Sequence, residues 1–380
     1  METVSISQCK DYKFEAIIKQ LRAIFAKYKV ADYIKPGKSV LLKVNLLTDK
    51  PPEAAVTTNP IFVKALARLV RELGAEVIIG DSPGGPFNTG LLKKVYHQTG
   101  LYELANEKGI ELNYDLAQEN IAFTGGKYKR SFIIAKYYAK ADFVINLPKL
   151  KTHGMAMMTG AVKNLFGAIP GLLKAEYHLK MPRIDLFAGM LIDLALCLKP
   201  DLTIMDAIIG MEGEGPSAGN PRKFGYIIAG LSPFAVDTAA AYLLGINPLT
   251  DLPTIQAAQE RGLPSSIADI ELAGDELRVL RDVKIPAIEK SSNLIDRKLP
   301  KNISNWLSPL LRPRPVFHHE KCTNCADCCR NCPADVITMK EKGPEVDLEN
   351  CIRCFCCQEL CKYQAVEIKR PLLGSLLFRL

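Results

Sequence analysis

The chain has 380 residues, 48% of them hydrophobic, which is enough for one large domain with its own core and a second, smaller domain. Its formal net charge of +8 fits an anionic substrate, an acidic protein partner or a membrane surface, or has no specific meaning. The charged start of the chain does not resemble a signal peptide, and no apolar stretch is long enough to span a membrane. We therefore expect a soluble protein, with no nucleic acid among its partners.

Only Cys9 and Cys197 of the twelve cysteines precede residue 320. This distribution indicates a reducing, cytoplasmic location rather than a disulfide framework.

Up to about residue 290, short apolar runs alternate with amphipathic segments. The spacing predicts helices over residues 14–28, 60–73, 91–108, 186–198 and 234–244. It predicts strands over residues 39–47, 76–80, 141–147, 202–205, 226–229 and 269–272. Such alternation is typical of an α/β fold, a mainly parallel sheet with helices on both faces. Ligands of such sheets bind beyond the carboxyl ends of the strands.

Polar side chains gather at or after these strand ends, and they are the candidates for substrate binding: Lys43, Asn45, Asp81, Ser82, Asn164, Asp206, Glu212 and Glu214. Each also has an ordinary structural explanation, because a strand lysine can reach solvent and an aspartate can cap a helix. The glycine-rich loops beside them match neither the P-loop nor the dinucleotide fingerprint. Their grouping at one edge nevertheless favours a binding site.

The centre of this edge is a cationic stretch whose members are the candidate catalytic residues: Lys149, Lys151, His153 and Lys163. Lysines beside glycines and helix starts favour an anionic ligand. His153 suits acid–base chemistry, a metal site or a purely structural role. Glu212 and Glu214 suit a divalent metal or a general base if they face the same site.

Several segments resemble the domain of unknown function 362 family over roughly residues 1–280: LLKVNLL, GDSPGG, INLPKLKTHGMAMMTGAVKNLFGAIPG, GMEGEGP and GLSPFAVDTAAAYLLG. The resemblance is most specific at Lys149–His153 and Gly160–Asn164. Members of that family often carry a ferredoxin module, and the family implies no agreed substrate.

Residues 291–314 read as a basic, proline-containing linker, in which Trp306 and nearby leucines are expected to dock on the large domain. The last ten residues, 371–380, form a strongly apolar tail. The tail suits packing between the domains, or contact with a partner or a membrane surface.

The spacing C-x2-C-x2-C-x3-C occurs twice between residues 315 and 370, and this run holds cubane iron–sulfur clusters. The region resembles bacterial-type two-cluster ferredoxins, in which the fourth cysteine of each run ligates the other cluster. One 4Fe–4S cluster is thereby assigned to Cys322, Cys325, Cys328 and Cys361. The second is assigned to Cys332, Cys351, Cys354 and Cys357.

Two cysteines in this region, Cys329 and Cys356, lie outside the assigned sets. They are interpreted as non-ligand thiols, with cluster tuning or a second ligation register as the alternatives. Paired C-x2-C steps also build zinc sites, but zinc has no need of a third step.

We therefore predict an iron–sulfur electron-transfer protein, with potentials of about −400 mV by analogy with low-potential ferredoxins. In one hypothesis it is an oxidoreductase whose clusters exchange electrons with a redox partner or donor and with an anionic substrate at the α/β domain. In a second, it is a carrier whose large domain only docks partners. A third makes it a cofactor or metal assembly protein. A flavin or a further metal at the site stays open.

Overall fold

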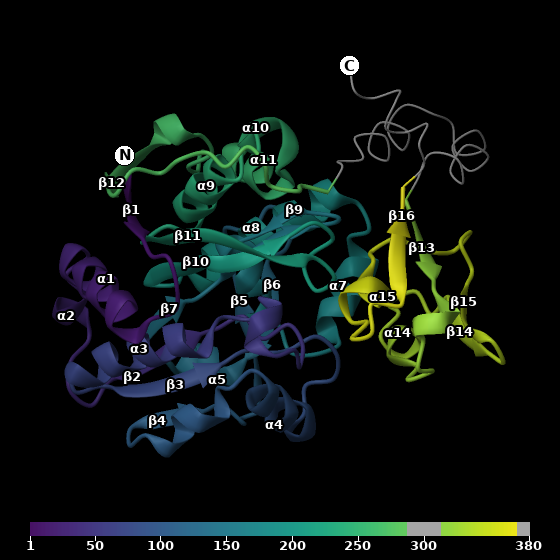
Figure 1. The fold of residues 1–380 in the computed structure, drawn as a ribbon, viewed down its shortest axis with the longest axis horizontal. Coiled ribbons are helices and arrows are strands. Elements are labelled where there is room, and N and C mark those ends of the chain that lie inside the picture. Colours follow the sequence, from purple (N-terminus) through teal and green to yellow (C-terminus); the bar gives the residue numbers. More distant parts are fainter. Residues whose placement is uncertain (287–312, 371–380) are drawn as a thin grey trace.

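The structure is a computed structural model that describes residues 1–286 and 313–370. Within these ranges, ten strands join in one sheet at the centre of the larger module (Figure 1). Eight of them lie in the order β12 (Ile270–Gly274), β1 (Glu2–Gln8), β11 (Asn220–Gly230), β10 (Leu202–Glu212), β7 (Phe143–Asn146), β2 (Ser39–Lys43), β3 (Glu76–Gly80) and β4 (Ile110–Leu112).

Neighbouring strands in this order run parallel, except where β11 pairs with β1 and with β10. The predicted α/β fold with a mainly parallel sheet is confirmed. The two other strands of the sheet, β8 (Lys149–His153) and β9 (Met157–Thr159), extend it beside β10. Because β2, β3, β7 and β10 run in the same direction, the segments that follow them begin at one edge.

Helices cover both faces because successive side chains of a strand point to opposite sides. Val40 and Leu42 of β2 belong to the core beneath α1 (Phe14–Lys27) and α3 (Pro60–Glu72). Leu41 belongs to the core beneath α8 (Ile184–Leu198).

The other elements of the larger module are α2 (Val30–Tyr33), α4 (Thr89–Gln98), α5 (Lys136–Lys140), α6 (Ala161–Asn164), α7 (Leu173–Lys180), α9 (Pro233–Leu243), α10 (Pro248–Asp251), α11 (Pro253–Gln259) and the hairpin of β5 (Gln118–Ala122) and β6 (Ser131–Ala135).

Several predicted elements differ in extent from the observed ones. The strand predicted over 39–47 ends at Lys43, and the strand predicted over 226–229 spans Asn220–Gly230. The helix predicted over 91–108 ends at Gln98, because Gly100 adopts a left-handed conformation with φ of 73° and a short 3-10 turn follows. The strand predicted over 202–205 continues to Glu212 as β10, so Asp206 and Glu212 lie within a strand rather than in a loop. The stretch Lys149–His153, for which the spacing predicts no element, is a buried strand, β8.

The smaller module is built from β13 (Arg314–Phe317), α14 (Asp327–Arg330), β14 (Ile337–Lys340), β15 (Gly343–Val346), α15 (Cys356–Glu359) and β16 (Val366–Lys369). Its second half repeats the first at an offset of 29 residues: β13 corresponds to β15, α14 to α15 and β14 to β16. The pairing is exchanged, since β13 pairs with β16 and β14 with β15. The duplication expected from the cysteines is therefore present in the backbone.

Most of the linker predicted over 291–314, including Trp306, lies outside the described residues, as does the tail predicted over 371–380. The domain boundaries drawn from the sequence stay predictions. Within residues 1–286 and 313–370, no helix combines the length and apolar character needed to cross a membrane.

Candidate functional site

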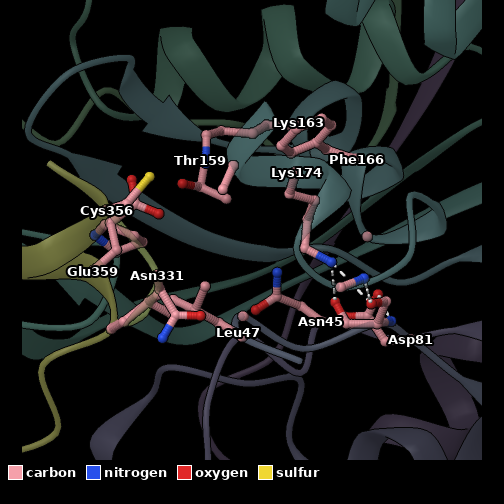
Figure 2. A pocket seen from close by; sticks show the side chains of 18 of the residues that line it. Asn45, Leu47, Asp81, Thr159, Lys163, Phe166, Lys174, Asn331, Cys356 and Glu359 are labelled. Carbon is pink, nitrogen blue, oxygen red and sulfur yellow. Dashed lines mark hydrogen bonds between the residues drawn. The ribbon is translucent and has the colours of Figure 1, made fainter. Parts of the chain in front are cut away.

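A cavity of about 100 Å³ lies between the two modules. The larger module lines it with residues that follow β2 and β3 and with side chains of α6 and α7, and the smaller module borders it with α15. Figure 2 shows Thr159 and Lys163 on one side of this space, Cys356 and Glu359 on a second and Asp81 on a third. The cavity therefore lies at the predicted edge of the sheet, but a second module completes its wall.

Six of the twelve residues predicted for the α/β site line the cavity: Asn45, Asp81, Ser82, Lys151, Lys163 and Asn164. Their catalytic or binding roles stay predictions.

Beneath the cavity, Lys43 and Asp81 form a buried ion pair at the ends of β2 and β3. The Lys43 ammonium lies 2.7 Å from Asp81 Oδ1, and both side chains are almost fully buried. Asp81 also accepts the backbone N–H groups of Leu46 and Ser82. Burial lowers the pKa of Lys43, and the Asp81 carboxylate opposes that shift. Gly167 permits this arrangement, because a Cβ there would lie 2.0 Å from Asp81 Oδ1.

A chain of side-chain amides joins the ends of several strands. Lys151 Nζ donates to Asn45 Oδ1 at 3.0 Å, and Asn45 Nδ2 donates to Asn164 Oδ1 at 2.9 Å. Asn164 Nδ2 then donates to Asn146 Oδ1 at 2.8 Å, and Asn146 Nδ2 donates to the carbonyl of Ala161 at 3.0 Å. Hydrogen bonds in such a chain polarise one another, so the network holds the Lys151 ammonium at a defined position in the wall.

Lys163 is positioned by a buried carboxylate from another helix. Asp237 of α9 accepts the backbone N–H groups of Ala161 and Val162 at the start of α6. Gly160 leaves room for this contact, since a Cβ there would lie 2.0 Å from Asp237 Oδ1. Burial raises the pKa of Asp237 to about 7, against the two N–H groups that favour its ionised form. Gly160 thus leaves room for the Asp237 carboxylate, and that carboxylate fixes the start of the helix that carries Lys163.

Two residues of α7 that line the cavity, Lys174 and His178, were missed by sequence reasoning. Lys174 Nζ donates to the carbonyl of Ser82, to its hydroxyl and to the carbonyl of Ile169. Burial lowers the pKa of Lys174 to about 7 and that of His178 to about 4. The segment LKAEYHLK reads as an ordinary amphipathic helix, so the sequence carries no signal for either residue.

The smaller module brings Glu359 of α15 into contact with His153 of β8. His153 Nδ1 accepts the backbone N–H groups of Met155 and Ala156, so the ring proton of the neutral imidazole resides on Nε2. Nε2 lies 3.0 Å from Glu359 Oε1, although not in line for a hydrogen bond. Burial by itself raises the pKa of Glu359, but Lys163 and His153 outweigh it and hold that pKa well below its usual range.

Burial and the nearby Lys163 ammonium together lower the pKa of Lys151 to about 7. Lys151, Lys163 and Lys174 line the cavity together with two carboxylates, Asp81 and Glu359. Since Asp81 is bound to Lys43, positive charge exceeds negative charge in the wall. This balance favours a bound anion.

Six predicted site residues do not line the cavity: Lys43, Lys149, His153, Asp206, Glu212 and Glu214. Lys149 Nζ lies 2.9 Å from Asp206 Oδ2 and 2.7 Å from the hydroxyl of Tyr12 in a closed, buried network. Glu212 accepts the backbone N–H of Lys284.

Glu214 binds Arg370 through both carboxylate oxygens, at 2.6 and 3.0 Å. This contact joins the two modules. A second ion pair between the modules joins Lys362 Nζ to Asp49 Oδ1 at 3.0 Å. Leu360 packs against Gly84, where a Cβ would lie only 2.3 Å from the leucine side chain. The smaller module is thus held against the cavity by ion pairs and by one close apolar contact.

The cysteines assigned to the second cluster line one cavity of the smaller module: Cys332, Cys351, Cys354 and Cys357. Burial raises the pKa of the Cys357 thiol, and the neighbouring thiols raise it further. Such crowded thiols ionise when a cationic centre binds them. Within residues 1–286 and 313–370, no three His, Cys, Asp or Glu side chains gather closely enough to hold a single metal ion. The four thiols therefore line one cavity without converging on a single ion.

The loops that carry the cysteines repeat the same backbone geometry. Asn324 and Ala326 have positive φ angles of 55° and 60°, and their counterparts 29 residues later, Arg353 and Phe355, have 55° and 59°. Left-handed residues without a glycine are unfavourable, so their recurrence indicates a required loop shape. The loops fit paired iron–sulfur sites. Both proposed ligand sets stay predictions; of the first set, Cys328 and Cys361 pack against the same small core.

Comparison with known proteins agrees with both parts of the chain. The model of the domain of unknown function 362 family matches residues 40–242. The chain belongs to this family. A model described as a 4Fe-4S dicluster domain matches residues 314–362 of this family member, so its smaller module is an iron–sulfur domain of the ferredoxin kind.

This member of the domain of unknown function 362 family is 34% identical over 278 residues to Thylakoid-associated protein sll1697 of Synechocystis, which covers 71% of this chain and 83% of that protein. A solved structure, the lactate racemase apoprotein of Thermoanaerobacterium thermosaccharolyticum, matches 61% of this chain and 55% of its own. That match has a TM-score of 0.39 and 12% identity. The cytoplasmic location expected from the sequence stays a prediction.

Proposed function

We propose that this protein is an oxidoreductase that passes single electrons between its iron–sulfur domain and a small anionic molecule in the cavity between the modules. The observation that supports this most strongly is the shared wall: Cys356 and Glu359, which flank the cluster ligand Cys357, border the same space as Lys151 and Lys163. A carrier that only docks partners has no need for a closed cationic cavity behind its cluster ligands.

Iron–sulfur clusters supply one electron at a time at low potential. The residues of the chain bind the anion, exclude water and exchange protons. The excess of positive charge holds the anion, and the apolar side chains of Leu47, Phe166 and Leu360 exclude water from it. Lys151 and Lys174, whose pKa values lie at about 7, exchange protons readily at neutral pH.

A two-electron reduction of the bound molecule balances with two single-electron transfers, which oxidise two clusters by one electron each, and two protons from solvent. The second cluster is the one next to the cavity, because the wall residues Asn331 and Cys356 directly precede its ligands Cys332 and Cys357. That the domain holds two clusters is proposed from the repeated cysteine spacing.

The proposal is tested by reoxidation of the reduced protein under anaerobic conditions. Dithionite-reduced wild type and Lys163→Ala are each mixed with methyl viologen and with a panel of small carboxylates, and cluster absorbance is followed. We expect Lys163→Ala to exchange electrons with the viologen normally but to lose reoxidation by a carboxylate acceptor. Lys27→Ala, at an exposed position of α1, is the control. Failure of every small anion to reoxidise wild type favours a simple carrier.

A further inference from the structure

Hydrogen-bonding groups in the cavity wall lack partners in the protein. The Thr159 hydroxyl is buried and makes no hydrogen bond, and Thr159 is 4% exposed. Within residues 1–286 and 313–370, no hydrogen bond or ion pair holds the Lys163 ammonium or the His178 ring. Both residues line the same cavity. Burying the Thr159 hydroxyl without a partner is unfavourable, so it is expected to meet a ligand, and the Lys163 ammonium and the His178 ring are available to the same ligand.

An acceptor without an in-line hydrogen bond lies on another side of the cavity. Glu359 Oε1 has no hydrogen bond, since His153 Nε2 approaches it out of line, and Glu359 is 8% exposed. Figure 2 shows Thr159 and Lys163 on one side of the space and Glu359 on another. The wall therefore offers donors in one place and a carboxyl oxygen that can accept a hydrogen bond in a second.

Part of the remaining wall is aromatic. Phe166 lines it, and the ring of His178 stacks on Phe187 at 4.2 Å between centroids and meets Phe166 edge-on. A ligand that satisfies every group thus has an anionic end, a short apolar body and a hydrogen-bond donor.

We propose that the cavity binds a small carboxylate that also carries a hydroxyl group, with Lys163 and Thr159 contacting the carboxylate and Glu359 accepting the hydroxyl hydrogen. This deepens the proposed function and rests on it for the identity of the cavity as the substrate site. It adds Thr159 and Glu359 to the binding residues. His178 then lies in the wall beside the ligand, where a ring nitrogen can form a hydrogen bond with a ligand oxygen.

The test compares two matched acids, butyrate and 3-hydroxybutyrate, with inorganic phosphate as a third probe. Binding to oxidised, cluster-loaded wild type is measured anaerobically by isothermal titration calorimetry. We expect 3-hydroxybutyrate to bind about tenfold more tightly than butyrate, the effect of one hydrogen bond to a buried oxygen that otherwise lacks one. Equal binding of the two acids, tighter binding of phosphate, or no binding of either acid overturns the proposal.

Variants then locate the bound acid. Lys163→Met is expected to weaken both acids about tenfold or more, and the isosteric Thr159→Val about threefold to tenfold. The controls are Lys27→Met and Thr250→Val, at exposed positions outside the cavity. Unchanged affinity in Lys163→Met overturns the placement. If a variant fails to fold, the comparison of the two acids on wild type still decides.

Because the titration uses oxidised protein, it is independent of electron transfer. A hydroxy acid is the reduced partner of an oxo acid, so electron transfer is tested with 3-oxobutyrate, which gives 3-hydroxybutyrate on taking up two electrons and two protons. Binding of the hydroxy acid without reoxidation of the reduced clusters by the oxo acid refutes the proposed function and leaves this inference standing. Reoxidation by a different class of anion, with no binding of the hydroxy acid, supports the proposed function and refutes this inference.

Discussion

Replacement of Lys43 by methionine tests the buried ion pair of Lys43 and Asp81, which lies beneath the cavity. The ammonium of Lys43 and the carboxylate of Asp81 are 2.7 Å apart, with side-chain exposures of 0% and 4%. Methionine has a similar length but leaves the carboxylate without its cation. Breaking one side of a buried pair lowers the free energy of unfolding by about 3–5 kcal/mol, because the remaining charge has lost its compensation.

A matched pair on the surface provides the control for this substitution. Lys38 lies 2.9 Å from Asp142, but the two side chains are 50% and 40% exposed. Solvent screens that pair, so Lys38→Met is expected to change stability by about 1 kcal/mol or less. Both variants are compared with wild type by anaerobic urea unfolding of the cluster-loaded protein, followed by circular dichroism. The reasoning fails if Lys43→Met is no more destabilising than Lys38→Met.

Three further outcomes follow from the same geometry. Gly160→Ala places a methyl group against Asp237, so it is expected to displace α6 and weaken anion binding at least tenfold, while iron content measured by colorimetric assay is unchanged. Loss of iron in that variant contradicts the assigned role. Gly84→Val forces Leu360 away and is expected to open the junction between the modules, seen as faster proteolysis between them with normal cluster absorbance; unchanged proteolysis argues against the contact. Because burial lowers the pKa of Lys151 to about 7, protonation below that pH is expected to strengthen anion binding as pH falls from about 8 to 6. Calorimetry at several pH values checks this, and Lys151→Met with the same pH slope as wild type refutes it.

The cysteine spacing and the strand pattern are local properties, so the sequence was sufficient to predict the iron–sulfur domain and the mainly parallel sheet. Asn45 and Asp81 were also predictable as neighbours, because parallel strands bring their carboxyl ends to one edge. Lys149 and Asp206 follow the same rule, but Tyr12 closes them into a buried network. No sequence pattern distinguishes a lysine that faces a cavity from one whose partner comes from a distant segment.

Glu359 and His178 were not predictable for a different reason. The place of Glu359 depends on how the smaller module docks, through contacts such as Arg370 with Glu214 and Leu360 with Gly84, which join residues far apart in the sequence. His178 lies on a helix whose pattern is that of any half-buried surface helix. Both belong to the site only because of tertiary packing.

The central claim is that the clusters exchange electrons with an anion in the adjoining cavity. It is tested most directly by iron and sulfide analysis combined with EPR of the reduced, anaerobic protein before and after addition of an oxocarboxylate, which can accept two electrons and two protons. The account predicts about eight irons per chain, interacting signals from two reduced clusters and a spectrum that changes when the anion is added. Zinc in place of iron, or an EPR spectrum that no anion alters, contradicts it.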